Sequence, residues 1–336
     1  MKKSIKIIIT VLTIVIVISL ITSIDALHLG RKTEKTQQLE RYEKHYVMIV
    51  ERLDSDFWQE VYQSAKKAAK KENAYLELLG QNISEEYGLS DYLQIAIAMN
   101  VDGILLWPDG SDEVRKLIEQ AQMNHIPVIT MLHDESGTKR ESFVGMNTYQ
   151  LGQLYAEQIR KLLKKGTTKI QVLYDLKQNS LENGMVYNQI KNELKANLSG
   201  RKKVQIEAHN IVDGSAFETE KEIRDIFVSG QEIPDIFVCM DEMETEYLYQ
   251  ALVDYNYVGK AALIGYYHSE NILRAIEKGN VAVTLEPDAG EVGKKSIESL
   301  TEYYDAGYVS EYYSVDCDII SKENVEAYLK ELKKEE

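Results

Sequence analysis

The histidines and cysteines are the residues whose spacing could form a metal site or a nucleophilic centre. The six histidines show no HxxxH or HExxH spacing, so we predict no metal site. The sequence has no GxSxG motif, no Walker A motif, no GxGxxG after a strand and no cysteine–histidine pair at a family spacing. With 54 Asp and Glu residues in the chain, a pair of neighbouring carboxylates does not by itself indicate a catalytic site. We therefore predict neither an enzyme nor a cofactor.

The two cysteines are Cys239 and Cys317, and each stands in a strand-like run. Two cysteines are too few for a disulfide scaffold, and free buried thiols are the favoured interpretation. A single bridge between them stays open as an alternative, because the sequence does not give the Cα separation that a disulfide requires.

The charge of the chain is strongly negative and unevenly distributed. The whole chain carries a net charge of −15, whereas residues 1–44 contain eight Lys/Arg and four Asp/Glu and are positive by four. The remaining 292 residues therefore carry −19. Such a domain repels phosphate backbones and anionic headgroups, so we predict no nucleic-acid partner.

An apolar run without charges, Ile7–Ile24, follows Lys2, Lys3 and Lys6. About 20 apolar residues of helix span a bilayer, and lysines before the span indicate a cytoplasmic N-terminus. We therefore predict that residues 1–26 form a single-pass membrane anchor with the bulk of the chain outside the cell. A cleaved signal peptide is the alternative, although the run is longer than the usual 7–15 residues of such segments. No cysteine follows it, which excludes a lipoprotein.

Beyond a polar stem at residues 27–44, about 290 residues remain, which is more than one hydrophobic core normally serves. Short β-rich runs alternate with longer amphipathic ones, a pattern typical of βαβ units and parallel sheets. We predict an α/β fold of two doubly wound lobes. The clearest expected strands are Tyr46–Val50, Ala74–Leu79, Gly103–Leu106, Val128–Met131, Lys169–Tyr174, Val204–His209, Asp235–Cys239, Ala261–Ile264, Val281–Leu285 and Tyr312–Ile320.

Six segments, in this order, make the chain resemble the type I periplasmic binding proteins, and in particular the ribose-binding-like sugar receptors. They are Ile49–Val61, Val101–Thr130, Phe143–Ile159, Pro234–Glu244, Ala262–Gly293 and Tyr312–Asn324. The resemblance covers about residues 45–336. LacI-type repressors share this fold, but they carry a helix-turn-helix where this chain has an apolar run and an acidic domain.

The resemblance implies two lobes that are joined by three crossings and close over a ligand. It places the crossings near Met146–Asn147, Leu285–Pro287 and Asp305–Val309. The N-terminal lobe would then comprise residues 45–147 and 287–308, and the C-terminal lobe residues 148–286 and 309–336.

Sugar receptors need aromatic rings to stack on sugar faces and polar groups to bind hydroxyls. Phe57 and Trp58 match the stacking aromatics of the family, with a core position at the start of a helix as the alternative. Asp54 matches a polar contact of the family, although Asp54 or Ser55 could instead cap the helix. Asp241 is a further candidate whose alternative role is a helix cap.

The polar clamp of the ribose-binding proteins is altered in this chain. His133 and Asp134 follow the fourth strand where the family has Asp-Arg, and Asn183 is the nearest polar residue to a missing arginine. Tyr267 replaces an aspartate, and Glu286 stands in place of a glutamine. With Met240 and Tyr266 nearby, the pocket would be more aromatic than a pentose site. The predicted ligand-binding residues are Asp54, Phe57, Trp58, His133, Asn183, Asp241, Tyr267 and Glu286.

These features predict reversible binding of a small solute, favouring a carbohydrate, by hinge closure. Two uses of closure remain open. The closed form could deliver the solute to an ABC permease, or it could report the solute to a membrane partner such as a sensor histidine kinase.

Overall fold

The computed structural model describes residues 42–50, 52–81, 87–175, 180–198, 202–211 and 215–335. The predicted anchor, residues 1–26, and nearly all of the predicted stem lie outside these ranges. Among the described helices, none is both long and apolar enough to cross a bilayer. Residues 44–336 form one compact unit, and the buried core residues lie between Tyr46 and Leu329. This unit therefore contains the core that it needs to fold by itself.

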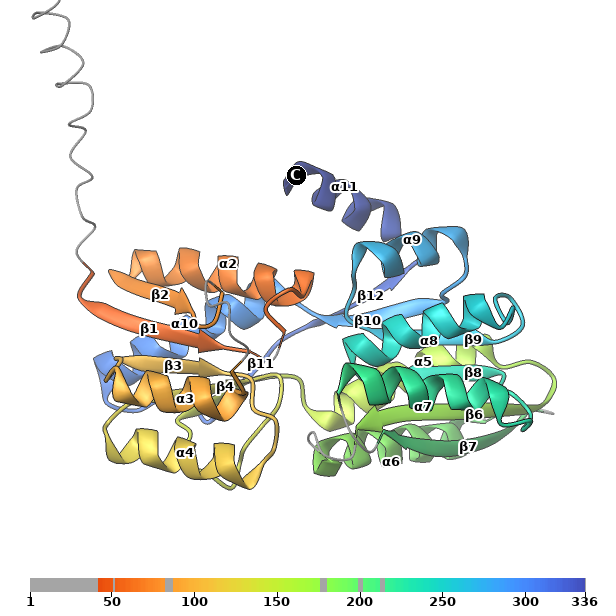
Figure 1. Ribbon diagram of the computed structural model, residues 1–336, viewed down its shortest axis with the longest axis horizontal. Coiled ribbons are helices and arrows are strands. Elements are labelled where there is room, and N and C mark those ends of the chain that lie inside the picture. Colours follow the sequence, from red (N-terminus) through yellow and green to blue (C-terminus); the bar gives the residue numbers. More distant parts are fainter. Residues whose placement is uncertain are drawn as a thin grey trace, which may run out of the picture. The chain divides into compact units, whose positions relative to one another are not determined.

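Two six-stranded sheets organise this unit, and strands alternate with helices along nearly all of the chain (Figure 1). The strands are β1 (Lys44–Ile49), β2 (Ala74–Leu78), β3 (Gly103–Leu106), β4 (Val128–Met131), β5 (Ser142–Gly145), β6 (Gly166–Asp175), β7 (Lys202–Ile211), β8 (Ile236–Cys239), β9 (Ala262–Tyr266), β10 (Val283–Pro287), β11 (Tyr312–Ser314) and β12 (Cys317–Ser321). The helices are α2 (Asp56–Lys71), α3 (Leu89–Ala98), α4 (Asp112–Met123), α5 (Thr148–Leu162), α6 (Ser180–Asn197), α7 (Ala216–Val228), α8 (Glu242–Asp254), α9 (Glu270–Lys278), α10 (Ala289–Ala306) and α11 (Val325–Glu335).

The two sheets repeat one strand order. The first sheet has the order β11-β5-β4-β3-β1-β2 and the second β12-β10-β9-β8-β6-β7, so β4 and β9 hold equivalent places. All the strand pairs are parallel except β10 with β12. Parallel sheets are covered on both faces by their crossover helices, and the predicted α/β fold of two doubly wound lobes is confirmed.

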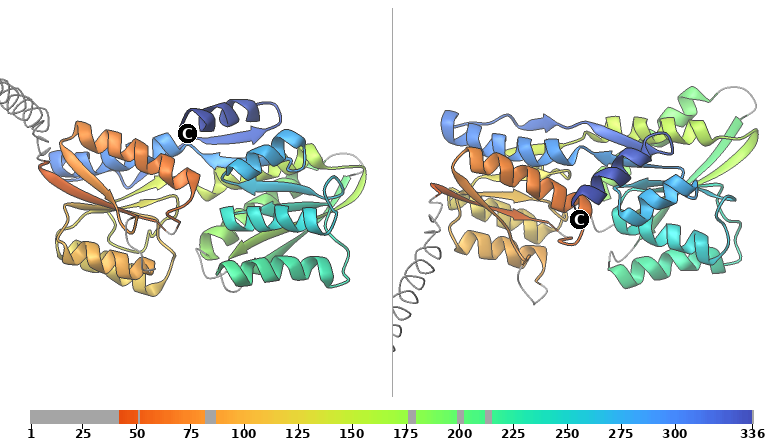
Figure 2. Two further views of the ribbon diagram at one scale, coloured as in Figure 1. Left: turned by 45° about the horizontal axis from the view of Figure 1, so that its top comes forward. Right: turned by 90° about the horizontal axis from the view of Figure 1, so that it is seen from above.

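Helices lie on both faces of each sheet (Figures 1 and 2). In the first lobe, α2 packs against α10 on one face and α3 against α4 on the other. In the second lobe, α5 packs against α6 on one face, and α7, α8 and α9 lie on the other. One cluster of buried residues includes the α2–α10 face of the first sheet and the α5–α6 face of the second. The apolar core is therefore continuous from one lobe to the other.

The third crossing lies later than expected. Residues Tyr312–Ser314 pair with β5 in the first sheet, whereas Cys317–Ser321 pair with β10 in the second. The predicted strand Tyr312–Ile320 is therefore two strands, and the predicted crossing at Asp305–Val309 is wrong. Val315 donates its backbone N–H to Gly145 in the first sheet, and Asp316 accepts from Asp288 at the start of α10. The chain passes between the sheets at these two residues.

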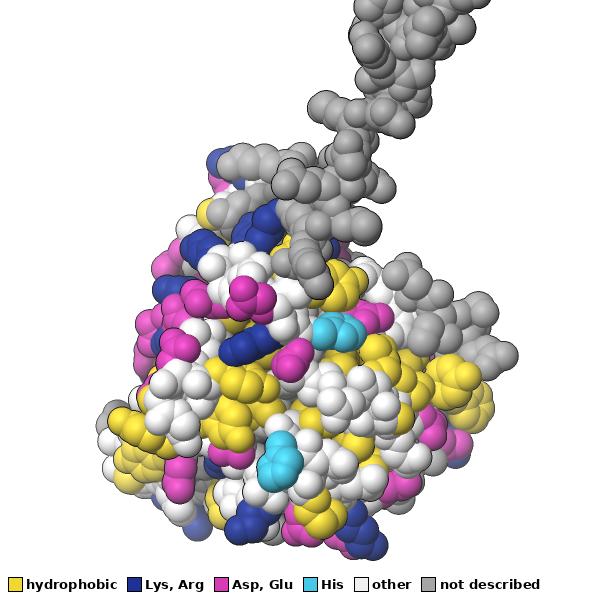
Figure 3. Space-filling model, turned by 90° about the vertical axis from the view of Figure 1, so that its left-hand side faces the viewer, with side chains coloured by type: hydrophobic (Ala, Val, Ile, Leu, Met, Phe, Trp, Pro, Cys, Tyr) yellow, Lys and Arg dark blue, Asp and Glu magenta, His cyan; other side chains and the backbone are white. Residues whose placement is uncertain are grey.

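Both cysteines are free thiols. Cys239 is buried in β8, and Cys317 is partly buried in β12. The favoured interpretation of free buried thiols therefore holds for Cys239, whereas Cys317 is only partly buried. Figure 3 shows one face of the molecule, on which acidic, basic and apolar side chains are interspersed among the described residues without a continuous basic area.

Candidate functional site

The predicted site residues follow the carboxyl ends of strands in both sheets. Asp54, Phe57 and Trp58 follow β1, and His133 follows β4. Asp241 and Tyr267 follow β8 and β9 in the second sheet, while Glu286 lies within β10. In open α/β sheets, ligands bind at these strand ends.

Four aromatic side chains, Phe57, Trp58, Tyr266 and Tyr267, form what we call the aromatic cluster. The rings of Phe57 and Tyr267 lie 4.4 Å apart between centroids, and this contact joins the first lobe to the second. Phe57 meets Trp58 edge to face at 5.2 Å, and Tyr266 meets Tyr267 at 4.3 Å. All four side chains are buried. The structure therefore brings three predicted site residues together with Tyr266, which was expected nearby.

The backbone of Tyr267 is held in an uncommon conformation. Its φ is +60°, in the left-handed region that non-glycine residues rarely adopt. Its N–H donates to Leu285 O at 2.9 Å, and its carbonyl accepts from the Thr284 hydroxyl at 2.5 Å. The Thr245 hydroxyl also binds the neighbouring Tyr266 N–H at 3.0 Å. Such a conformation persists only where the surroundings enforce it, as these bonds do.

Leu132, at the end of β4, has the same left-handed conformation, with φ +61°. Its N–H donates to Val144 O on the neighbouring β5 at 2.8 Å, as the N–H of Tyr267 donates to β10. The equivalent strands of the two sheets therefore end in the same bend.

Opposite charges also face one another around the cluster. Arg52 of the first lobe pairs with the exposed Asp54 at 3.4 Å. Burial lowers the pKa of Arg52, but Asp54 and the negative charges of Glu242 and Asp241 in the second lobe raise it overall. Burial raises the pKa of Glu242 to about 6, although Arg52 opposes that shift. Neither Arg52 nor Glu242 was predicted from the sequence, because 190 residues separate them.

Asp241 has the capping role that was its alternative. Its carboxylate accepts the backbone N–H groups of Met243 at 2.7 Å and Glu244 at 3.4 Å at the start of α8. Burial raises its pKa, and these hydrogen bonds oppose the rise. At the start of α2, by contrast, Ser55 is the N-cap residue but makes no side-chain capping bond.

His268 and Glu286 form a buried ion pair that the sequence did not predict as a pair. The Nδ1 atom of His268 bonds a carboxylate oxygen of Glu286, and both side chains are 7% exposed. Burial lowers the pKa of His268, but the bond and charge of Glu286, with Glu60 and Asp56 of α2, raise it overall. The ring of Tyr328 in α11 lies 6.1 Å away. The charges around His268 therefore come from both lobes.

His133, the other predicted histidine, has a different setting. Its ring lies 5.1 Å from the ring of Trp107, and it hydrogen-bonds the Pro108 backbone. Burial lowers the pKa of His133 to about 4, so the ring is neutral at pH 7. Its neighbour Asp134 binds Arg140 at 2.5 and 3.0 Å. Asn183 lies partly buried in α6.

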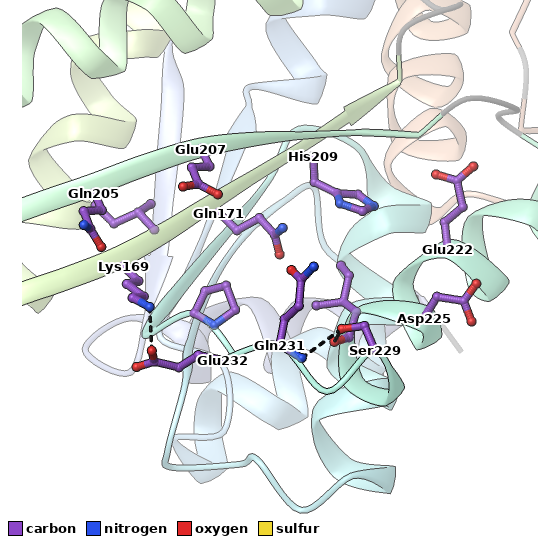
Figure 4. A pocket seen from close by; sticks show the side chains of 13 residues that line it. Lys169, Gln171, Gln205, Glu207, His209, Glu222, Asp225, Ser229, Gln231 and Glu232 are labelled. Carbon is purple, nitrogen blue, oxygen red and sulfur yellow. Dashed lines mark hydrogen bonds and ion pairs between the residues drawn. The ribbon is translucent and has the colours of Figure 1, made fainter.

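A cavity of about 500 Å³ lies away from these residues, in the second lobe (Figure 4). It opens between the strands β6 and β7 and the helix α7, and Lys169 binds Glu232 at its edge at 2.5 Å. Its labelled side chains are polar or charged, and its lining contains no Phe, Tyr or Trp on which a sugar could stack. None of the predicted ligand-binding residues lines it.

A family model described as a periplasmic binding protein domain matches residues 46–307. The chain belongs to this family. Its members are solute-binding proteins, as the resemblance implied. Among the described residues, no group of three His, Cys, Asp or Glu side chains could hold a metal ion. A search of curated proteins found no match.

Several solved structures have a similar fold. GanP, a glucose-galactose binding protein from Geobacillus stearothermophilus, is 22% identical with a TM-score of 0.73, over 84% of this chain and 98% of that one. AraP, an arabinose binding protein from the same organism, is 21% identical with a TM-score of 0.68, over 85% and 99%. The XylFII–LytSN complex contains a chain 21% identical with a TM-score of 0.68, over 83% and 98%. At these identities the likeness establishes the fold alone.

Proposed function

We propose that this protein reversibly binds a sugar between the carboxyl ends of its two sheets. The observation that carries the proposal is the aromatic cluster, to which each lobe contributes rings at its strand ends. Aromatic faces stack on the apolar faces of sugars, while carboxylates and amides nearby bind hydroxyls. The sugars named for GanP and AraP support this ligand class.

The proposed mechanism is hinge closure about the three crossings. A sugar that contacts Trp58 in one lobe and the β8 and β9 ends in the other binds both lobes only when they are together. Such a ligand shifts the population toward the closed form by its difference in affinity for the two forms.

Replacing Trp58 with leucine should weaken sugar binding by about 1–3 kcal/mol, because the stacking face is lost while most of the buried volume is kept. A thermal-shift screen of residues 44–336 against D-glucose, D-galactose, D-arabinose and D-fucose first identifies the ligand. A sugar at 100 times its Kd should stabilise the protein by about 2.7 kcal/mol. Calorimetric titration then compares wild type, Trp58→Leu and Trp58→Phe, of which the phenylalanine variant should keep part of the affinity. Equal affinity in all three would mean that Trp58 is only a core residue, and binding by none of the sugars would remove the proposed function.

Sensing is the second candidate use of closure, beside delivery to an ABC permease. XylFII, which has this fold, was solved in complex with LytSN, so a chain of this architecture forms a complex with a second protein. We propose that the present chain reports its sugar to a membrane partner such as a histidine kinase. Crosslinking in intact cells, with and without sugar, should recover a kinase if this is right and a permease if delivery is right.

We also propose that the apolar run Ile7–Ile24 anchors the protein in the cell membrane. The full-length protein should then stay in the membrane fraction after a high-salt wash, since hydrophobic insertion is insensitive to salt. Mass spectrometry should find residues 1–26 intact in that fraction. A soluble form that begins near Leu27 would show a cleaved signal peptide instead.

A further inference from the structure

The contact between Phe57 and Tyr267 covers the surface that a sugar would use. Phe57 is fully buried, and Tyr267 is 6% exposed. Their ring centroids lie 4.4 Å apart with an interplanar angle of 31°, which is within stacking range. A sugar cannot occupy the same face of Phe57 while this contact lasts.

The direction of the Tyr267 side chain is built into the backbone. The left-handed conformation at this residue is held by hydrogen bonds to Thr284 and Leu285 of β10 and, through Tyr266, by Thr245 of α8. The phenol ring also lies 4.3 Å from the ring of Tyr266, which limits its movement within the second lobe. A strained residue fixed in this way is a feature that the surrounding structure maintains.

The phenol side chain resembles a sugar in its chemistry. It has a flat apolar face and a hydroxyl at its edge, so it can satisfy the same aromatic surface of the opposite lobe. Arg52, facing Glu242 and Asp241 from the other lobe, adds an attraction across the same boundary. The ring contact and this longer-range attraction between opposite charges therefore both favour the closed arrangement of the lobes.

We propose that Tyr267 competes with the ligand. Its ring stacks on Phe57 and keeps the lobes closed until a sugar displaces it. The inference rests on the proposed function for the identity of the ligand, but not for the closure itself. A protein whose binding-competent form is only a fraction of the population binds its ligand more weakly by that fraction. Tyr267 thus lowers the affinity of the cleft, and only a ligand that makes enough contacts to offset the loss of the Tyr267–Phe57 contact can bind.

The test is Tyr267→Asn in residues 44–336. Asparagine tolerates the left-handed conformation, so the ring is removed without new backbone strain. Phe217→Ala is the matched control, because it truncates an aromatic side chain of the same lobe that is 70% exposed. Small-angle scattering without sugar should give a larger radius of gyration for Tyr267→Asn than for wild type and Phe217→Ala. Phe57→Leu should have the same effect, and the double variant should add nothing further.

Calorimetric titration with the four sugars of the screen measures the second half of the proposal. Any sugar that binds wild type should bind Tyr267→Asn at least about tenfold more tightly. An unchanged radius in a folded Tyr267→Asn variant, or weaker sugar binding, would overturn the proposal, the latter by making Tyr267 a simple ligand contact. A larger radius with no sugar bound by either protein would retain the closure contact and refute the proposed sugar-binding function instead.

Discussion

Replacing His268 with leucine should lower the free energy of unfolding at pH 7 by about 3–5 kcal/mol, because a buried carboxylate would lose its partner. The Glu286 side chain is 7% exposed and bonds the Nδ1 atom of His268. Without the imidazole, the Glu286 carboxylate would remain buried and would lose the ring nitrogen that it bonds. Urea unfolding followed by circular dichroism measures the change.

The double variant His268→Leu, Glu286→Leu is the control. Replacing a whole buried pair with apolar residues is often neutral, so the double variant should recover most of the lost stability. If it is as unstable as His268→Leu, the loss comes from packing and the ion-pair interpretation is wrong.

The pH dependence of the pair has a definite sign. The pKa of His268 is raised by Glu286, so the stability that the pair contributes is complete below about pH 6.5 and declines as pH rises through the raised value. Glu286→Gln keeps a hydrogen-bond acceptor but removes the charge. In this variant the free energy of unfolding should therefore decline less between pH 6 and 9 than in the wild type. Unfolding curves over that pH range measure the difference.

Replacing Gly293 with alanine should destabilise the protein by about 1–3 kcal/mol, although glycine-to-alanine changes usually stabilise helices. Gly293 lies where α10 crosses α2. A Cβ atom there would meet Val61 O at 2.3 Å and Ala65 N at 2.7 Å, and both are backbone atoms that cannot rotate away. The helices would have to separate, and α2 carries Phe57 and Trp58, so sugar affinity should fall as well.

Gly184→Ala in α6 is the matched control for this variant. Apart from its chain neighbours and the backbone of its own helix, nothing lies within 4 Å of a Cβ built at Gly184, so alanine should stabilise the helix by about 0.5–1 kcal/mol. Chemical denaturation of both variants separates packing from propensity. Two stabilised variants would show that α2 and α10 are not in backbone contact.

Periodicity was sufficient to predict most of the fold. The strands Gly103–Leu106 and Val128–Met131 have the predicted bounds, since short buried apolar runs specify them locally. The split of Tyr312–Ile320 could not be predicted in the same way. No glycine or proline interrupts that run, and its break at Val315 and Asp316 depends on two pairing partners, β5 and β10, that are distant in sequence.

The candidate site was predictable only in part. The resemblance supplied Phe57, Trp58 and Tyr267, which the structure joins. It gave no sign that Tyr267 would lie on Phe57, because these residues are 210 positions apart in the sequence and their contact depends on how the two lobes are arranged. The pairing of His268 with Glu286 likewise needs two adjacent strand ends, and a histidine two residues before α9 gives no local signal of a buried ion pair.

Leu132 and Tyr267 end equivalent strands with the same bend, and in each case the next residue is a histidine. The repeated strand order and the repeated bend give the two lobes the same local architecture at these positions. The two histidines have different electrostatic settings, because burial lowers the pKa of His133 to about 4 while the bond and charge of Glu286 raise the pKa of His268. Burial and ion pairing therefore act in opposite directions on two histidines that hold equivalent positions in the two lobes.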